Sequence, residues 1–590
     1  MSAAVVTGMA WATPLGDGLR EVWERLCAGD TGVAPVPSPH RVRTDLAAAV
    51  PSPPYRPAGA EARERQIALA VNTMTAALAD AGVSADDPRL TLVLGTSFGA
   101  RLDGAEDPAE DWAEAVARRL GHGGRPVVVT TACSAGSDSL LVARTLIRAS
   151  GGERICLAGG VDVLTEAKRL GHSALGTMSP TGLRAFDETH DGMILGEGAG
   201  FLVLEGAAAA RRRQARVYAT LRGAGSANDA SGLTAPDPSG RTVTASVSRC
   251  LAGTGTGPGD VAVICAHGTG TPLNDEVEAA GVERLFGGRG GGPAPVVFGT
   301  KGALGHSLGA TGAIEAVATV LALDEGRVPP LPGLASPLPG WSLRLPADGP
   351  EKVHGTAGVS LTLGFGGFNT CLLFTAGAPE EDRPQTVPSG ERPPLSVAGH
   401  ASVTVADPVS RARNKPSFYA DPVAWLIVSA AEEALASCRE AVLAEPDEVA
   451  VLVTSAGGAL PTHERIVRDA ARGLVSPLRF AGANPGILAG LTCITLGLRG
   501  PSLALEGRPG DAADTALTVA GDWLRTGQAR SVLWVAYRRG DGAHTAGCVV
   551  LRAQGPGDGD ADGAALAREL LTAAPGGRSR RDTTDASHHG

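Results

Sequence analysis

The sequence has few aromatic residues, no long apolar run and no basic cluster, and each absence excludes a class of protein. Aromatic residues make up 4% of the 590 residues, and the formal net charge is −10. No stretch reaches the roughly 18 consecutive apolar residues of a membrane span. No basic segment interleaved with aromatics suits nucleic acid, and the N-terminus lacks the regions of a signal peptide. We therefore predict a cytoplasmic protein with no membrane span and no nucleic-acid partner.

Paired cysteines and phosphate-binding loops are also absent. The nine cysteines are scattered, mostly in apolar runs, and form no CxxC pair, a pattern typical of reduced thiols rather than of a disulfide framework. No GxxxxGK[ST] segment occurs, so the many glycine-rich turns do not indicate a nucleotide phosphate site.

What the sequence does contain is a repeated alternation of strand and helix patterns. Its length indicates two or more domains, and the alternation predicts α/β layers. A proline-rich, charged segment predicts a linker. The predicted helix at 424–438 and strand at 448–459 match the helix at 62–82 and the strand at 90–100 in order and spacing, which indicates an internal repeat. The predicted boundaries are 1–206 and 207–375 for two halves, 376–394 for the linker, 395–553 for a third unit and 554–590 for a mostly disordered tail.

The chain is organised around residues 127–147. Valines and threonines predict a buried strand, the segment turns at Cys133, and leucines recur at helical spacing from Ser137 onward. A thiol at a strand-to-helix turn lies near unpaired N–H groups and the positive end of a helix. We therefore expect its pKa to be lowered from about 8.5 toward neutrality, making Cys133 a nucleophile. The alternative, for an isolated cysteine, is a buried structural residue.

Histidines follow two other predicted strands on glycine-rich turns. His267 lies in AHGTGTP, and Lys301 and His306 lie in GTKGALGH. Because α/β folds place active sites at strand ends, two histidines in such positions favour a functional site over a purely structural role. His172, in GHSALGTMSP, is a weaker candidate that suits packing at the rim of a cleft.

Two carboxylates and one further turn complete the candidates. Asp275 follows His267 by eight residues, and Glu315 follows His306 by nine. The turn GFGGFN, with Phe365 and Gly366 in its middle, supplies backbone N–H groups.

Six motifs together resemble the β-ketoacyl-ACP synthases, condensing enzymes of the thiolase fold. In chain order they are TTACSAG, AGGVD, LRAFDETHDGMILGEGAGFLVLE, AHGTGTP, GTKGALGH and GFGGFN, and the resemblance covers residues 1 to about 375. It implies an α/β, five-layer αβαβα thiolase-like fold. The two histidines resemble the elongating Cys-His-His class, whereas thiolases use a second cysteine and initiating synthases use Cys-His-Asn.

The resemblance implies a β-ketoacyl-[acyl-carrier-protein] synthase, an acyltransferase of polyketide or fatty-acid-type biosynthesis. Cys133 would take an acyl chain from an acyl carrier protein, and malonyl-carrier would lose CO₂ and condense with it. His267 and His306 would donate hydrogen bonds to the malonyl thioester carbonyl. No metal or organic cofactor is expected, because the phosphopantetheine arm belongs to the carrier.

Supporting roles follow from the same resemblance. The N–H groups of Cys133 and Phe365 would form an oxyanion hole, with Phe365 also matching the gate residue of the acyl pocket. Lys301 would orient His306, and Glu315 would support Lys301.

The chain departs from the family in two places. The interval Ser97–Pro126 is short and acidic, whereas relatives carry a longer segment there that lines a dimer interface. His172 stands where many relatives carry phenylalanine.

Residues 476–510 resemble the longer family segment that is shortened at Ser97–Pro126. Pro509 stands near the position where the nucleophilic cysteine would be expected, and Cys493 lies too early in the segment to take that position.

Residues 395–553 are therefore predicted to be a degenerate, truncated thiolase-like half. We expect this half to pack on the catalytic part as an intramolecular partner, with a homodimer or an inert fusion remnant as alternatives. For the whole chain, acyl transfer or hydrolysis at Cys133 and a carrier-docking scaffold remain as alternative functions.

Overall fold

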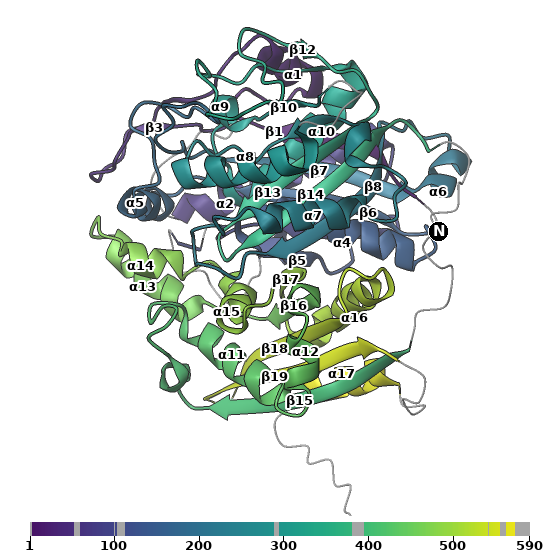
Figure 1. Ribbon diagram of the computed structural model, residues 1–590, viewed down its shortest axis with the longest axis vertical. Coiled ribbons are helices and arrows are strands. Elements are labelled where there is room, and N and C mark those ends of the chain that lie inside the picture. Colours follow the sequence, from purple (N-terminus) through teal and green to yellow (C-terminus); the bar gives the residue numbers. More distant parts are fainter. Residues whose placement is uncertain are drawn as a thin grey trace, which may run out of the picture.

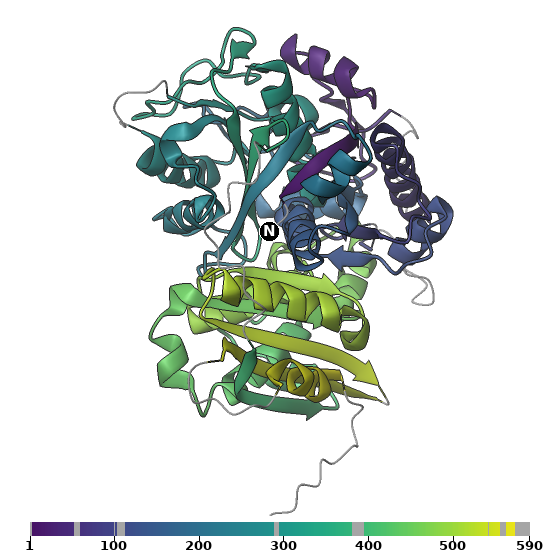
Figure 2. The same cartoon turned by 90° about the vertical axis from the view of Figure 1, so that its right-hand side faces the viewer.

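Three groups of five strands share one topology and join edge to edge into a 15-stranded sheet within the described residues (Figures 1 and 2). The computed structural model describes residues 3–51, 60–99, 101–102, 112–287, 294–379, 394–540, 542–554 and 562–572. In each group, numbered along the chain, the strand order is 1-5-4-2-3, with antiparallel pairing at strand 5 and parallel pairing around strand 2.

The strands are as follows, in sheet order. The first group is β1 (Ala4–Ala12), β7 (Gly198–Gly206), β6 (Ile155–Asp162), β4 (Leu90–Gly95) and β5 (Val127–Val129). The second is β8 (Ala219–Asn228), β14 (Phe368–Ala376), β13 (Ala357–Gly364), β9 (Val261–Cys265) and β10 (Val296–Phe298). The third is β15 (Leu395–Val405), β19 (Ala543–Ala553), β18 (Ser531–Gly540), β16 (Val449–Ser455) and β17 (Ser502–Glu506).

Helices α4 (Ala135–Ala149) and α10 (Thr311–Glu325) lie between the first and second groups and contact strands of both. Helix α2 (Ala60–Ala81) covers the first group and α7 (Arg241–Leu251) the second. The order is helix, sheet, helix, sheet, helix, which confirms the predicted five-layer α/β fold. None of the helices in the described ranges combines the length and apolarity needed to cross a bilayer.

The other helices and short strands in the described part of residues 3–379 connect these layers. They are α1 (Leu19–Cys27), β2 (Ala34–Pro35), β3 (Leu46–Ala47), α3 (Trp112–Leu120), η1 (Ala132–Ser134), α5 (Glu166–Leu175), α6 (Ala207–Arg212), η2 (Pro258–Asp260), α8 (Pro272–Phe286), α9 (Lys301–Leu304), η3 (Leu308–Ala310), β11 (Arg327–Val328) and β12 (Glu351–Lys352).

The two central helices approach closely because glycine stands where they meet. A Cβ atom on Gly136 would lie 2.7 Å from the backbone nitrogen of Ala313 and 3.0 Å from the carbonyl oxygen of Gly309. No side chain fits at that distance, so glycine is required for α4 to pack against α10. This contact fixes the start of α4 relative to the second group of strands.

The third unit, residues 395–572, carries helices on both faces of its strands. They are η4 (Pro408–Arg411), α11 (Pro422–Ala434), α12 (Arg439–Leu443), η5 (Pro446–Glu448), α13 (Leu460–Ala470), α14 (Pro477–Ala481), α15 (Ile487–Leu496), α16 (Pro509–Arg525) and α17 (Gly563–Thr572). Helix α17 packs on β15, β19 and α16, so the packed unit extends past the predicted boundary at residue 553. The predicted linker and the rest of the tail lie largely outside the described residues.

The third unit pairs with the first group through equivalent strands. β17 runs antiparallel to β5, with Leu505 opposite Val129, and the Thr130 N–H donates to the Ala504 carbonyl at 3.0 Å. An ion pair between the largely buried side chains of Arg101 and Glu506 crosses the same junction. The strand that leads to Cys133 is therefore covered along its edge by the third unit.

Candidate functional site

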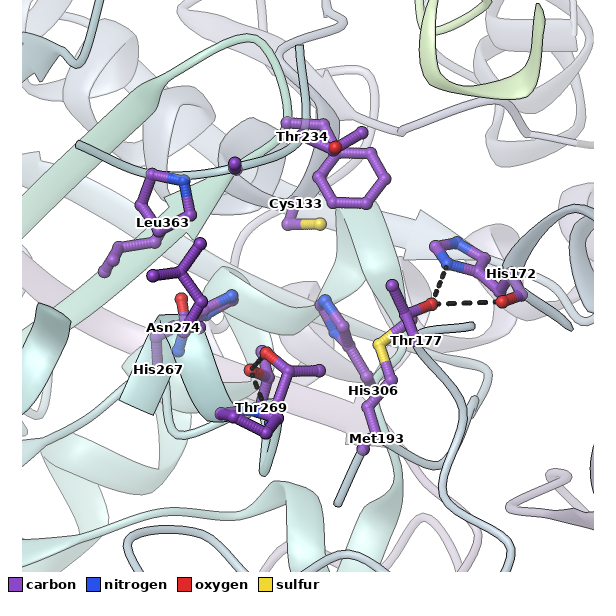
Figure 3. Close-up of a pocket in the computed structure, with 18 of the residues that line it drawn as sticks. Cys133, His172, Thr177, Met193, Thr234, His267, Thr269, Asn274, His306 and Leu363 are labelled. Carbon is purple, nitrogen blue, oxygen red and sulfur yellow. Dashed lines mark hydrogen bonds between the residues drawn. The ribbon is translucent and has the colours of Figure 1, made fainter. Parts of the chain in front are cut away.

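Cys133, His267 and His306 lie around one cavity of about 390 Å³ (Figure 3). Cys133 lies in η1, between β5 and α4, while His267 follows β9 and His306 follows α9. All three are buried, and the two imidazole rings meet edge to face with centroids 5.3 Å apart. The structure thus brings together the three residues that the sequence predicts as catalytic.

The turn that carries Cys133 is held in a strained conformation by a buried carboxylate. Ala132 has a φ of 55°, an uncommon value for a residue with a side chain. Asp138 accepts hydrogen bonds from the hydroxyls of Thr131 at 2.5 Å, Ser134 at 2.7 Å and Thr370 at 2.6 Å. These bonds tie the turn to α4 and β14, so the position of the sulfur is set by both groups of strands.

The environment of the Cys133 thiol does not lower its pKa. Burial raises the pKa of Cys133 to about 12, although the charge of Lys301 and the N–H groups of Phe365 and Cys133 oppose that rise. The lowered pKa expected from the sequence is therefore wrong for this cavity, because loss of water outweighs the helix end. Cys133 rests as a thiol at neutral pH, and its attack on a substrate must be accompanied by proton transfer.

Both histidines are neutral. Burial and the nearby Lys301 charge hold the pKa of His267 and of His306 well below the ordinary value of 6.5. The Nδ1 atom of His306 lies 3.0 Å from the Thr311 hydroxyl, and Nδ1 of His267 is buried without a partner in the described part of the chain. A neutral imidazole can donate a hydrogen bond without carrying charge, which suits stabilisation of a developing oxyanion.

The lowered histidine pKa values lead to a pH prediction. Since both rings take up a proton only well below pH 6.5, we expect the rate of a reaction that uses them as neutral donors to stay constant, within about twofold, from pH 8 down to pH 6. A rate measurement across this range checks it. A loss of activity with a midpoint near the ordinary imidazole pKa of about 6.5 would contradict it.

Lys301 is hydrogen-bonded to the segment of His267. Its ammonium donates to the backbone carbonyl of His267 and to Glu315, the latter at 2.5 Å, and among the described residues no hydrogen bond joins Lys301 to the His306 ring. The predicted orienting role toward His306 is wrong, because Thr311 on α10 holds that ring instead. Glu315 forms a buried ion pair with Lys301, in line with its predicted supporting position. Burial raises the pKa of Glu315 to about 7.

Two carboxylates on α8 hold the loop of His267. Glu278 accepts from the N–H groups of His267 at 2.6 Å and Gly268 at 2.8 Å, while Asp275 accepts from the N–H of Gly270 at 3.1 Å. The sequence prediction named Asp275 and missed Glu278. The signal was available, because residues three apart lie on the same face of a helix.

The turn between β13 and β14 supplies one N–H group to the cavity. The N–H of Phe365 faces the Cys133 sulfur, whereas the N–H of Gly366 donates to the Leu233 carbonyl at 2.9 Å. Gly366 is therefore not an oxyanion donor, contrary to its place in the predicted set. Gly366 and Gly367 both have a φ of 84°, so the turn needs glycine at these positions.

The donor set of the cavity is not that of a metal centre. Within the described ranges, no three side chains of His, Cys, Asp or Glu gather as metal ligands. The cavity wall combines a thiol, imidazoles, threonine hydroxyls, an amide and two carboxylates, Asp191 and Asp229, with apolar residues.

Two family models match the chain. The model described as "Beta-ketoacyl synthase, N-terminal domain" matches residues 1–210, and "Beta-ketoacyl synthase, C-terminal domain" matches residues 218–335. Among curated proteins, the mitochondrial 3-oxoacyl-[acyl-carrier-protein] synthase of Arabidopsis thaliana is 34% identical over 44% of this chain and 58% of its own length. 3-Oxoacyl-[acyl-carrier-protein] synthase 2 of Staphylococcus aureus (strain COL) is 33% identical over 43% and 62%. The chain thus spans about three fifths of these relatives.

Solved structures extend the similarity. A β-ketoacyl synthase from Burkholderia phymatum STM815 has a TM-score of 0.57 and 28% identity, covering 64% of this chain and 100% of that one. A PfaC ketosynthase–chain length factor has a TM-score of 0.74 and 16% identity, covering 94% of this chain and 78% of that one. The second match shows the fold alone, and its coverage includes the third unit.

Proposed function

The chain belongs to the β-ketoacyl synthase family, and on that premise we propose that it condenses a carrier-bound acyl chain with malonyl-carrier, releasing CO₂. The observation that carries the proposal is the cavity itself, where a cysteine faces two neutral imidazoles and the N–H of Phe365. The phosphopantetheine arm of the carrier would bring both substrates, so the chain needs no cofactor of its own.

The first half-reaction is acyl transfer. The Cys133 sulfur attacks the thioester carbonyl, and the N–H groups of Cys133 and Phe365 stabilise the oxyanion. The bond to the carrier sulfur breaks, and the proton lost by Cys133 goes to the departing carrier thiolate. Because the resting thiol has a raised pKa, we expect this proton to move as the sulfur attacks rather than before.

The second half-reaction is decarboxylation and carbon–carbon bond formation. The carbon–carboxylate bond of malonyl-carrier breaks to give CO₂ and an enolate, whose oxygen accepts hydrogen bonds from His267 and His306. The enolate carbon attacks the acyl-Cys133 carbonyl, and the carbon–sulfur bond breaks so that the sulfur leaves as thiolate and takes up one proton from water. A β-ketoacyl-carrier results.

The test is a reaction with acyl-loaded and malonyl-loaded carrier, followed by intact-mass analysis of protein and carrier. We expect an acyl adduct on Cys133 and then a carrier mass increased by the acyl group and decreased by CO₂. An adduct that only hydrolyses or moves to another carrier, with no β-ketoacyl product, would instead establish acyl transfer without condensation.

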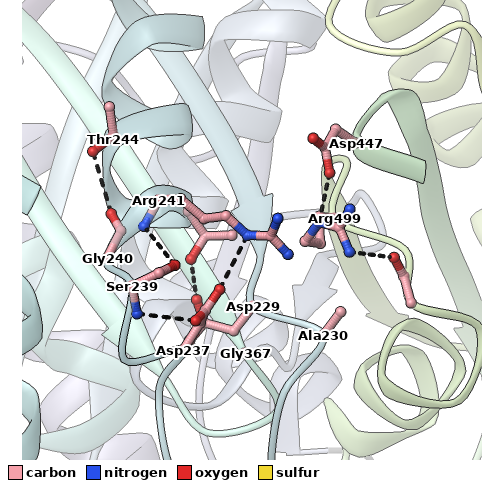
Figure 4. Close-up of polar contacts among 12 residues, drawn as sticks. Asp229, Ala230, Asp237, Ser239, Gly240, Arg241, Thr244, Gly367, Asp447 and Arg499 are labelled. Atoms are coloured by element: carbon pink, nitrogen blue, oxygen red, sulfur yellow. Dashed lines mark hydrogen bonds and ion pairs between the residues drawn. The ribbon is translucent and has the colours of Figure 1, made fainter. Parts of the chain in front are cut away.

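We further propose that the third unit replaces a second subunit. It pairs with the edge strand β5 of the first group. Arg249, in α7 of the second group, donates hydrogen bonds to the backbone carbonyls of Asp447 and Arg499 in the third unit. Figure 4 shows Arg499 of the third unit paired with Asp447 and, in the second group, Asp237 bound to Ser239 and Arg241. The fold match to a ketosynthase–chain length factor supports this partner role.

An intramolecular partner leads to a prediction about assembly. Because β5 is already paired with β17, a second copy cannot add to that edge. We expect light scattering after gel filtration to give the mass of one chain at micromolar concentration. A mass of two chains that does not change on dilution would contradict the proposal.

The third unit also supports the oxyanion turn. A Cβ on Gly490, in α15, would lie 2.6 Å from the carbonyl oxygen of Gly366. Asn228 links the same carbonyl to the Ser502 hydroxyl through two hydrogen bonds of 3.0 Å. The third unit therefore contacts the turn whose Phe365 N–H faces Cys133.

Replacing Gly490 by alanine is expected to displace that turn. We expect kcat for condensation to fall about tenfold to a hundredfold with little change in KM, because a misplaced oxyanion donor weakens transition-state stabilisation. Gly521→Ala is the matched control, since a Cβ there meets nothing within 4 Å. Equal activity of the two variants would show that the third unit does not position the turn.

A further inference from the structure

Two segments of the chain, 186–196 and 267–274, meet in the cavity wall. Met193 from the first and Thr269 and Asn274 from the second lie around the cavity (Figure 3). The Gly192 N–H donates to the Gly270 carbonyl at 2.9 Å and joins the two segments. How firmly they are held together therefore affects the shape of the cavity where a substrate enters.

A histidine and a carboxylate face each other where these segments meet. Nδ1 of His190 lies 3.6 Å from a carboxylate oxygen of Asp275, and the two side chains are 6% and 0% exposed. Nδ1 is buried and has no hydrogen-bond partner within the described residues. In the same part of the chain, no lysine or arginine pairs with Asp275. Because a buried carboxylate is costly without a cation, a proton on His190 supplies the charge that Asp275 lacks.

Asp275 bonds to both segments. One of its oxygens accepts from the Phe186 N–H at 2.9 Å, and this is the oxygen that faces His190. The other accepts from the Gly270 N–H at 3.1 Å and from the Asn274 amide at 3.2 Å. The carboxylate thus links the first segment to the part of the second segment that lines the cavity.

The charged groups around His190 favour its protonated form. Asp275 raises the pKa of His190 above the ordinary 6.5, with smaller contributions from Glu276 in α8 and from Asp187 in the 186–196 segment, while burial opposes the rise. Arg184, which precedes that segment, forms its ion pair elsewhere. An imidazolium at position 190 is therefore surrounded mainly by negative charge.

We propose that protonated His190 is a positioning residue that holds the two segments together through Asp275, so that the cavity binds thioester substrates more tightly at pH 6 than at alkaline pH. The inference rests on the proposed function and adds pH regulation to its site. Glu278, rather than Asp275, holds the N–H groups of His267 and Gly268. The effect therefore falls on KM, and the rate at saturating substrate keeps the flat pH profile expected for the neutral catalytic imidazoles.

The experiment measures how Cys133 is loaded from butyryl-pantetheine, a thioester that carries the arm of the carrier without the protein. Adduct formation is followed by intact mass, and KM is determined at pH 6 and pH 8.5. We expect KM of the wild type to be about tenfold higher at pH 8.5, the usual effect of losing one hydrogen bond between charged groups.

Variants at position 190 separate charge from shape. His190→Arg, or His190→Lys if arginine prevents folding, keeps its charge at both pH values and should give the low KM at both. His190→Gln has no charge and should give the high KM at both. His354→Gln is the matched control, because His354 is exposed and does not line the cavity. It should keep the wild-type pH dependence.

The free energy of unfolding gives a second readout that does not depend on activity. A group with a raised pKa contributes its full stabilisation below its ordinary pKa of 6.5, and this is lost as pH rises through the folded-state pKa. Denaturant titrations should therefore show a larger loss of stability in His190→Gln at pH 6 than at pH 8.5. A purely steric role of the imidazole would give equal losses.

The outcomes separate this proposal from the proposed function. Equal KM values of the wild type at the two pH values, or a wild-type pH profile in His190→Gln, would overturn the positioning role. So would equal losses of stability at pH 6 and pH 8.5. If Cys133 gains no adduct at either pH, the proposed acyl transfer fails, while the unfolding measurements still decide whether His190 and Asp275 act as a charged pair.

Discussion

Replacing Cys133 by alanine is expected to abolish acyl loading and condensation while malonyl decarboxylation continues. The Cys133 thiol is the only nucleophile proposed for acyl transfer, so the rate of condensation should fall by roughly 10⁴-fold or more. Decarboxylation depends on hydrogen bonds from His267 and His306, which lie across the cavity and remain in place. Intact mass and CO₂ release measure the two halves of the reaction in one sample.

The control is Cys27→Ala, because Cys27 is buried in α1 and does not line the cavity. It should keep both activities. The complementary variant, His267→Ala, should keep acyl loading and lose roughly 10²–10³-fold in decarboxylation, the usual effect of removing one oxyanion donor. An acyl adduct that persists in Cys133→Ala would refute the assignment of the nucleophile.

Replacing Lys301 by methionine is expected to destabilise the fold as well as the site. Lys301 and Glu315 are both almost completely buried, at 1% and 0% exposure of their side chains. Removing one partner of a buried pair leaves an uncompensated charge and costs about 3–5 kcal/mol. Denaturant titrations of wild type and Lys301→Met, followed by tryptophan fluorescence, measure the loss.

The pH dependence of that loss follows from Glu315. Burial raises its pKa to about 7, so the folded protein retains a proton that the unfolded chain releases above its ordinary pKa of 4.5. The group therefore contributes its full stabilisation below about pH 4.5, and this is lost as pH rises through about 7. Lys301→Met should thus be more destabilising at pH 8 than at pH 6.

A second substitution separates stability from activity. The double variant Lys301→Met/Glu315→Gln removes both charges and should recover most of the lost stability. It should still condense slowly, because the carbonyl of His267 has lost its Lys301 donor. Equal stability of the single variant at the two pH values would contradict the role of the buried carboxylate.

Local patterns were enough to find the residues that meet in the cavity. Cys133 and His267 directly follow runs of β-branched residues, and His306 follows another strand after one short helical turn. The ends of parallel strands in one fold converge, so glycine-rich turns at these points could be assigned to a common site. The repeated pattern in residues 395–553 likewise anticipated strands that the structure arranges in the same 1-5-4-2-3 order.

Several properties of the site depended on contacts between segments far apart in the chain. The sequence indicates a helix end near Cys133, but the raised thiol pKa comes from burial by loops of both strand groups. Lys301 and His306 are neighbours in the sequence, yet the ammonium binds the His267 carbonyl and Glu315. Gly366 lies in the predicted oxyanion turn, yet its N–H is taken by Leu233.

The amino-acid sequence by itself determined the alternation of strands and helices, the nucleophile at its strand-to-helix turn and the two histidines, because these follow from periodicity and short motifs. Only the tertiary structure decided the protonation states and the partners of Lys301. Desolvation and packing are set by atoms that the fold brings together from distant segments, and no local pattern records them.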